Sequence, residues 1–214
     1  GDFVISAHEA TLSNLHAEIN GIVQSDGGGS WAAVMAYPSS MHLTVGYTGK
    51  LLGDYTGFEA TGESSLVNDG LVEGVIGAAF IGESESSLIV NRGTIHGWSD
   101  GLLLTGDETT VLNHGLIAAE ETWATQGSAI KSTAVSTTVV NDGAIRASYI
   151  KSDAINVYHL NGEIGGRTFV LDNTGSVTSD GRFGVRVDDG VASTIINGGT
   201  ISGDKGSLYL SYSA

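Results

Sequence analysis

The segment Ile89-Val90-Asn91-Arg92-Gly93-Thr94-Ile95 decides the fold, because its pattern recurs along the chain. The pattern is an apolar residue, any residue, Asn, any residue, Gly, any residue, and then Ile or Val. Six copies are centred on asparagines spaced 23, 22, 28, 32 and 24 residues apart, namely Asn68, Asn91, Asn113, Asn141, Asn173 and Asn197. A weaker copy at residues 45–51 places Tyr47 at the Asn position, and a still weaker one lies at residues 17–23. A period of this length is typical of stacked structural repeats.

Strand geometry explains why these positions are apolar, Asn and Gly. Side chains in a strand alternate between its two faces, so the residue two before the Asn, the Asn itself and the residue four after it share one face of an extended chain. The outer two positions are always Ile, Leu or Val, which predicts that this face points inward. We therefore expect the asparagines to stack inside a corner and to bond to one another along the axis. The Gly is expected to supply a positive φ at that corner.

A second pattern follows the first and predicts further strands in each repeat. A turn of Gly, Ser and Asp leads into a short apolar run, as in Ser99-Asp100-Gly101-Leu102-Leu103-Leu104. The prediction is an all-β, right-handed parallel β-helix (β-solenoid) of about eight coils of roughly 22–32 residues, with the hand taken from the rule for parallel crossovers. An antiparallel β-sandwich or barrel is the alternative, because short strands with Gly-rich turns also fit that class.

We expect one continuous domain. Residues 41–214 form the coils, and residues 1–40, which include Pro38 and the run Gly27-Gly28-Gly29, form an irregular first coil or an N-terminal cap. At the other end, the strand-like run Leu208-Tyr209-Leu210-Ser211-Tyr212 has no polar cap. Because an open strand edge invites pairing, we expect the native protein to continue beyond Ala214 or this edge to stack on another chain.

Composition narrows the class of partner. The chain has 9 Lys and Arg against 24 Asp and Glu, a net charge of −15, which argues against nucleic acid and anionic lipid as partners. No stretch approaches the ~18 apolar residues of a membrane span, so we expect no membrane insertion of this segment. Cysteine is absent and the histidines have no zinc-site spacing, so no metal and no cofactor are expected. An acidic chain rich in Gly, Ser, Thr and Asn is common among exported bacterial proteins, which predicts a secreted or bacterial cell-surface location.

The units Asn91-Arg92-Gly93-Thr94-Ile95-His96-Gly97 and Asn197-Gly198-Gly199-Thr200-Ile201-Ser202-Gly203 resemble the repeats of autotransporter passenger domains and related bacterial surface adhesins. The resemblance covers roughly residues 40–214. It implies a cell-surface β-solenoid with a structural or adhesive role. Its partner would be a glycan or protein on a host or bacterial surface, or another copy of the chain. That family spans adhesins, biofilm proteins and toxin stalks, so the resemblance specifies the architecture better than the ligand.

Three aromatic residues are the candidate binding residues. Trp98, Trp123 and Tyr149 each follow an Asn-x-Gly-x-Ile unit by a few residues, in successive coils. Stacked on one side of the rod, they would form a platform for sugar rings or an apolar partner. The alternative is that they cap coil ends or pack against loops. Longer repeats also place insertions at residues 118–127 and 158–167, which would elaborate one side of the rod.

The arrangement of the acidic residues bears on whether the protein could cleave polysaccharides. Glycoside cleavage needs two carboxylates that face each other across a groove. The candidate cluster comprises Asp153, Asp180, Arg182, Arg186, Asp188 and Asp189. However, the Ser-Asp-Gly/Ala element recurs, which indicates turn formation, at residues 25–27, 99–101, 152–154 and 179–181. The expected function is non-catalytic display and adhesion. The alternative is a polysaccharide lyase or glycosidase on a β-helix, and the third hypothesis is a phage or virus fibre segment, which would be trimeric.

Overall fold

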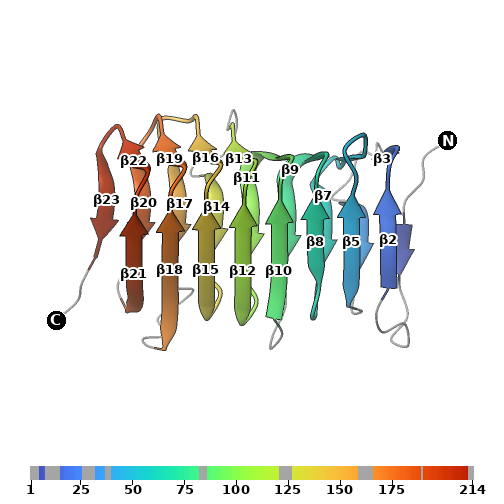
Figure 1. Ribbon diagram of the computed structural model, residues 1–214, viewed down its shortest axis with the longest axis horizontal. Coiled ribbons are helices and arrows are strands. Elements are labelled where there is room, and N and C mark those ends of the chain that lie inside the picture. Colours follow the sequence, from blue (N-terminus) through green and yellow to red (C-terminus); the bar gives the residue numbers. More distant parts are fainter. Residues whose placement is uncertain are drawn as a thin grey trace.

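The computed structural model describes residues 5–7, 15–25, 32–36, 40–81, 86–120, 127–158, 166–188 and 190–211. The regular elements in these ranges are 23 β-strands, which stack along one long axis (Figure 1). Every strand pair that the structure describes is parallel. The predicted all-β parallel β-solenoid is therefore confirmed, and its about seven turns are close to the eight expected. The antiparallel alternative is wrong.

Each complete coil contributes to three faces. The first face is an eight-stranded sheet of β2 (Leu15–Ile19), β5 (Met41–Val45), β8 (Ser65–Asn68), β10 (Ser86–Asn91), β12 (Glu108–Asn113), β15 (Ser136–Asn141), β18 (Arg167–Asn173) and β21 (Val191–Asn197). The second face contains β3 (Ile22–Gln24), β6 (Lys50–Leu52), the starts of β9 (Leu71–Phe80) and β11 (Thr94–Leu104), β13 (Leu116–Ala119), β16 (Ala144–Ala147), β19 (Ser176–Ser179) and β22 (Thr200–Gly203). The third face contains β1 (Ile5–Ala7), β4 (Ala32–Ala36), β7 (Thr56–Ala60), the ends of β9 and β11, β14 (Ser128–Ser132), β17 (Asp153–Val157), β20 (Phe183–Val187) and β23 (Gly206–Leu210). Because β9 and β11 continue from the second face onto the third, these two faces form one 15-stranded sheet.

The strands before residue 41 belong to the same stack, since β1 to β4 pair in register with later strands. Along the first face, Ile19 pairs with Val45, and Val45 pairs with Asn68. The sequence pattern assigns Tyr47 to the Asn position, and this assignment is wrong. Val45 occupies that position, because the inward site accepts an apolar side chain as well as Asn. Tyr47 and Thr48 are instead a two-residue insertion in the turn before β6.

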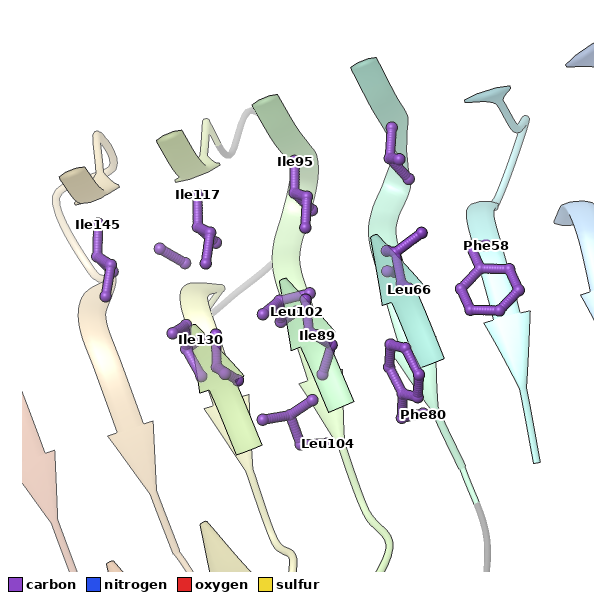
Figure 2. Close-up of a cluster of buried hydrophobic side chains, with 14 of the residues drawn as sticks. Phe58, Leu66, Phe80, Ile89, Ile95, Leu102, Leu104, Ile117, Ile130 and Ile145 are labelled. Carbon is purple, nitrogen blue, oxygen red and sulfur yellow. The ribbon is translucent and has the colours of Figure 1, made fainter. Parts of the chain in front are cut away.

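The core runs along the whole axis of the stack. Ile95, Ile117 and Ile145 are fully buried and pair in register from coil to coil on the second face. Figure 2 shows these side chains in line between neighbouring strands, with two phenylalanines beside them. Phe58 and Phe80 meet edge to face, with ring centroids 5.5 Å apart. Each coil therefore buries its apolar side chains against its neighbours, which a single coil could not do.

The repeated asparagines form a hydrogen-bonded ladder inside the corner between the first and second faces. The Nδ2 of each donates to the Oδ1 of the next at 2.6–2.8 Å, from Asn68 through Asn91, Asn113, Asn141 and Asn173 to Asn197. The Nδ2 of Asn91 also donates to the carbonyl oxygen of Leu116 at 3.1 Å. All of these side chains except that of Asn197 are buried. A one-residue slip between coils would leave buried amides unpaired, so the ladder holds the register.

The glycine two residues after each Asn is required by backbone proximity, and the predicted positive φ is wrong. Among the described residues, the glycines with positive φ are Gly62, Gly166, Gly190 and Gly206. At Gly115, an added Cβ would lie 2.2 Å from the carbonyl oxygen of Gly93 in the preceding coil. The corresponding distance is 2.1–2.3 Å at every other copy, namely Gly70, Gly93, Gly143, Gly175 and Gly199. The coils approach so closely at this corner that no side chain fits between them.

Replacing Asn113 by Ala tests the ladder. The change removes the acceptor of the Asn91 amide and the donor to Asn141 in the core. Because each orphaned buried group costs about 1–3 kcal/mol, we expect the free energy of unfolding to fall by roughly 2–5 kcal/mol in urea denaturation followed by circular dichroism. Asn197→Ala, at the exposed end of the ladder, is the matched control and should lose about 1 kcal/mol or less. Equal losses in the two variants would contradict a stabilising role for the buried amides.

Two Gly→Ala variants test whether the corner glycines are needed because the backbone there is crowded. Gly115→Ala places its Cβ 2.2 Å from a carbonyl oxygen, whereas Gly198→Ala meets no atom closer than 3.9 Å. We expect the first variant to lose at least about 2 kcal/mol of unfolding free energy, as overpacked sites do. The second should stay within about 0.5 kcal/mol of the wild type. Thermal and urea unfolding of both variants would check this, and a tolerated Gly115→Ala would show that the coils can move apart there.

Candidate functional site

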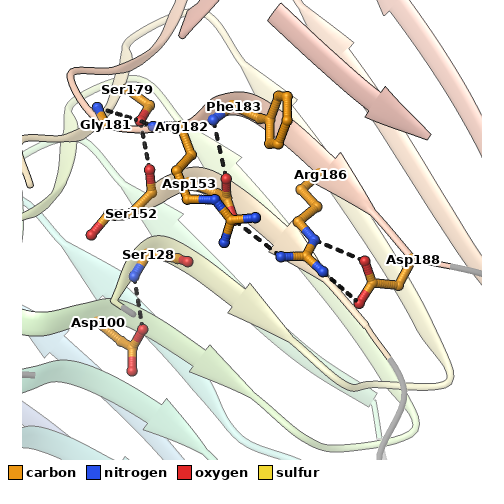
Figure 3. A network of polar contacts seen from close by, with 10 residues as sticks. All are labelled: Asp100, Ser128, Ser152, Asp153, Ser179, Gly181, Arg182, Phe183, Arg186 and Asp188. Carbon is orange, nitrogen blue, oxygen red and sulfur yellow. Dashed lines mark hydrogen bonds and ion pairs between the residues drawn. The ribbon is translucent and has the colours of Figure 1, made fainter. Parts of the chain in front are cut away.

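Charged side chains gather on the outer surface of the third face. Lys131 in β14, Asn156 in β17 and Arg186 in β20 are neighbours in register and lie on this surface. Two aspartates stand where strands of the same face begin, Asp153 in β17 and Asp100 within β11, two coils before it. In Figure 3 the hydrogen bond from the Ser128 N–H to Asp100 stands apart. Asp153, Arg182, Arg186 and Asp188 form one network of polar contacts. It contains most of the cluster that the sequence predicts.

Asp153 is the buried centre of this network, with 2% of its surface exposed. Its Oδ1 accepts a hydrogen bond from the Phe183 backbone N–H at 3.1 Å. Its Oδ2 lies 3.7 Å from a guanidinium nitrogen of Arg182 and 4.0 Å from one of Arg186. Arg186 in turn binds Asp188, with Nε 2.8 Å from Oδ1. Two arginines therefore share one buried carboxylate, and one of them also holds a more exposed carboxylate.

Asp100 repeats this arrangement with a lysine. Its side chain is buried, accepts a hydrogen bond from the Ser128 backbone N–H at 2.9 Å, and lies 3.5 Å from Nζ of Lys131. In both places the carboxylate accepts a hydrogen bond from the backbone of the next coil, because the strand register places the first residue of the next strand beside it. These aspartates therefore act first as ties between coils.

Burial dominates the titration of both aspartates. Burial raises the pKa of Asp153 above its ordinary value, although the Phe183 N–H bond and the charges of Arg182 and Arg186 lower it. Burial likewise raises the pKa of Asp100, although the charge of Lys131 and the Ser128 N–H bond lower it. The desolvation of each carboxylate thus outweighs the attraction of its cationic neighbours.

The four acidic residues that the sequence groups together do not share one groove in the structure. Asp153 and Asp188 lie on either side of Arg186 (Figure 3). Asp180 instead binds Arg146 of the second face at 3.0 Å, and Asp189 lies outside the described residues. The carboxylates of glycosidases face each other across space for the substrate, whereas a guanidinium fills the position between this pair. The arrangement neutralises charge and joins coils.

The Ser-Asp-Gly element forms the predicted turn at residues 179–181, whereas residues 99–101 lie inside β11 and Asp153 begins β17. The hydroxyl oxygen of Ser179 accepts hydrogen bonds from the backbone N–H groups of Gly181 and Arg182, at 3.1 and 3.0 Å. The same hydroxyl donates to the carbonyl oxygen of Ser152 in the preceding coil at 2.7 Å. This pattern satisfies the backbone at the turn between the second and third faces.

The predicted aromatic platform is partly described. Trp98 lies at a β-bulge in β11, is 44% exposed, and meets His96 edge to face with ring centroids 5.0 Å apart. Tyr149 is partly buried in the turn after β16, at the same corner of the solenoid two coils further on. Trp123, which would stand between them, lies outside the described residues. Trp98 and Tyr149 therefore follow one corner, and their use as a platform stays a prediction.

The strands that flank the two predicted insertions belong to different pairs of faces. Residues 118–127 span the end of β13 and the connection to β14, between the second and third faces. Residues 158–167 connect β17 to β18, between the third and first faces. Residues 121–126 and 159–165 lie outside the described ranges. The expectation that both insertions elaborate one side of the rod therefore falls on residues outside the described ranges and stays a prediction.

The outer surface of the first face carries two rows of mostly uncharged side chains. One row stands directly before the asparagines and contains Val67, Val90, Leu112, Val140, Asp172 and Ile196. The other contains Ser65, Leu88, Thr110, Thr138, Val170 and Thr194. Leu88, Val140 and Ile196 are 40%, 37% and 58% exposed. The sequence pattern leaves the position before each Asn unrestricted, although five of its six copies have Val, Leu or Ile there. Strand alternation would have placed these residues outside.

The buried aspartates make stability depend on pH. For an acid whose pKa is raised by folding, the free energy of unfolding is highest below the ordinary value, 3.8, and falls as the pH rises towards the folded-state pKa. We expect the thermal unfolding midpoint to fall as the pH rises above about 4, and to fall less in Asp100→Asn and in Asp153→Asn. The Asn at position 100 keeps the oxygen that accepts the Ser128 N–H. Asp204→Asn, at an exposed site, should keep the wild-type pH dependence. A wild-type slope in both core variants would contradict this assignment.

No helix in the described part of the chain is long and apolar enough to span a membrane. Within the same ranges, no group of three or more His, Cys, Asp or Glu side chains is placed to hold a metal ion. The chain matches no known protein family, no curated protein and no solved structure. A functional proposal for it therefore rests on the fold and on the geometry of its side chains.

Proposed function

We propose that this protein is a non-catalytic structural and adhesive module, secreted or held at a bacterial cell surface. Its partner is a glycan or protein on a host or bacterial surface, or another copy of the chain. The observation that supports this most is the pair of uncharged rows on the first face. The chain has a net charge of −15, yet both rows are free of charge from Ser65 to Val140. Contiguous exposed apolar side chains are typical of interaction surfaces.

The scaffold suits such a role because it holds these rows at fixed spacing. Neighbouring strands lie about 4.8 Å apart, and the register is continuous along the first face from β8 to β21. The Asn ladder and the core hold each coil on its neighbour. A partner that meets one coil therefore meets equivalent groups on the next, and many weak contacts act together.

A polysaccharide-active enzyme is the second candidate, and one observation favours it. Asp153 is a buried carboxylate with a raised pKa close to Asp188, and perturbed carboxylates cluster at catalytic sites. Polysaccharide cleavage that Asp153→Asn abolishes, with the circular dichroism spectrum unchanged, would replace the adhesive proposal. A trimer in analytical ultracentrifugation would favour the phage or virus fibre instead.

The double variant Leu88→Lys/Val140→Lys tests the adhesive face. We expect beads coated with it to bind roughly tenfold less than wild-type beads, because an interface that buries an unpaired charge loses about 1.4 kcal/mol or more. The binding surfaces are epithelial cells, bacterial cells and beads that carry the same protein. Asp204→Lys, at an exposed site in the turn between β22 and β23, changes the net charge by the same amount and should bind as the wild type does. Unchanged adhesion of the double variant to all three surfaces would contradict the proposal.

A further inference from the structure

A shallow depression lies over the corner between the first and second faces, near the N-terminal coils. It has room for about 590 Å³, within the range of small-molecule sites. Its lining comes from three successive coils. The residues before the corner glycines are Tyr47, Asp69 and Arg92, those after them are Lys50, Leu71 and Thr94, and the glycines between are Gly49, Gly70 and Gly93. The coil spacing makes the depression about 10 Å long from Tyr47 to Arg92.

Tyr47 is held in solvent at the edge of this depression. The insertion of Tyr47 and Thr48 distinguishes this turn from the Asn-x-Gly turns of the later coils. The turn is fixed by a hydrogen bond from the Gly49 N–H to the Gly46 carbonyl at 2.7 Å and by one from the Thr48 hydroxyl to the Asn20 carbonyl at 2.8 Å. Tyr47 is 89% exposed. A fixed turn thus presents an aromatic ring that no other part of the described chain covers.

The charged groups of the depression include one that is unpaired. Arg92 binds Asp69 in the preceding coil at 3.0 Å, and both side chains stay partly exposed, at 53% and 36%. Lys50 is exposed and has no ion-pair partner among the residues that the structure describes. The local charge is therefore positive in a chain whose net charge is −15. An anionic group is the complement of Lys50.

We propose that this depression binds an acidic saccharide, a pyranose that carries a carboxylate or sulfate group. The apolar face of the sugar ring stacks on Tyr47, as sugar rings do on exposed aromatic side chains. The anionic group lies at Lys50. The ion pair of Asp69 and Arg92 offers both acceptors and donors to neighbouring hydroxyl groups, and Thr94 adds a further hydroxyl. A free anion would use Lys50 but would leave the aromatic ring uncovered.

This site is distinct from the uncharged rows of the first face. Lys50, Leu71 and Thr94 open the strands of the second face, whereas Leu88 and Val140 lie on the first. Saccharide binding here does not depend on adhesion through those rows. Failure of one proposal therefore leaves the other standing, and the Leu88→Lys/Val140→Lys variant should retain wild-type saccharide binding.

The test uses an array of immobilised saccharides and the whole chain. It includes oligogalacturonate, its fully methyl-esterified form, sialylated oligosaccharides, sulfated glycosaminoglycan fragments, and neutral oligosaccharides. We expect binding to at least one acidic saccharide, with esterified oligogalacturonate and the neutral oligosaccharides bound at least about tenfold less tightly. Free sulfate and acetate at the same concentration should compete poorly, since they lack a ring.

Two pairs of variants locate the binding. Tyr47→Ala and Lys50→Gln should each weaken binding of the acidic saccharide by about tenfold or more. Tyr55→Ala, a 43% exposed tyrosine at a different corner, and Lys205→Gln, an exposed lysine of the last described turn, should bind as the wild type does. No preference for acidic over neutral saccharides, or equal losses in the test and control variants, would overturn the proposal. Circular dichroism of each variant checks that the fold is retained.

Discussion

The hydrogen bond from one asparagine side chain to the next is the interaction on which the solenoid depends. A stack of parallel strands has no intrinsic reason to keep one alignment, because apolar side chains slide past one another at little cost. A buried side-chain amide favours one alignment, because any other alignment leaves it without hydrogen-bond partners. From Asn68 to Asn173 the amides are buried and bonded, and the apolar columns of the core follow their register.

With the register held, each outward position becomes a column that runs along the solenoid. The columns differ in chemistry from face to face. The first face carries two rows of mostly uncharged side chains. The third face carries Lys131 and Arg186 beside two buried aspartates. The corner between the first and second faces carries the pairs Asp69–Arg92 and His114–Asp142. A simple repeat thus places surfaces of different chemistry on one solenoid.

The sequence alone predicts the positions that repeat in each coil, but not the contacts between neighbouring coils. The inward columns and the positions of the asparagines follow from strand alternation, so Asn113 could be placed from its neighbours in the repeat. The need for Gly at position 115 could not be predicted, because the crowding there comes from a carbonyl oxygen in another coil. Tyr47 was misplaced because the Gly spacing resembles the repeat, whereas the chain preserves the apolar column and inserts residues beside it. The contacts of Asp153 depend on turn lengths that no local pattern specifies.

Every bond of the asparagine ladder points the same way. In each pair the amide nitrogen belongs to the earlier coil and the amide oxygen to the later one. The amide dipoles therefore add along the axis, and each polarises the next in a medium of low dielectric constant. In the parallel sheets the backbone bonds point both up and down the stack, so they contribute little net dipole. The solenoid thus has an electrical direction, set by a single column of side chains at its corner.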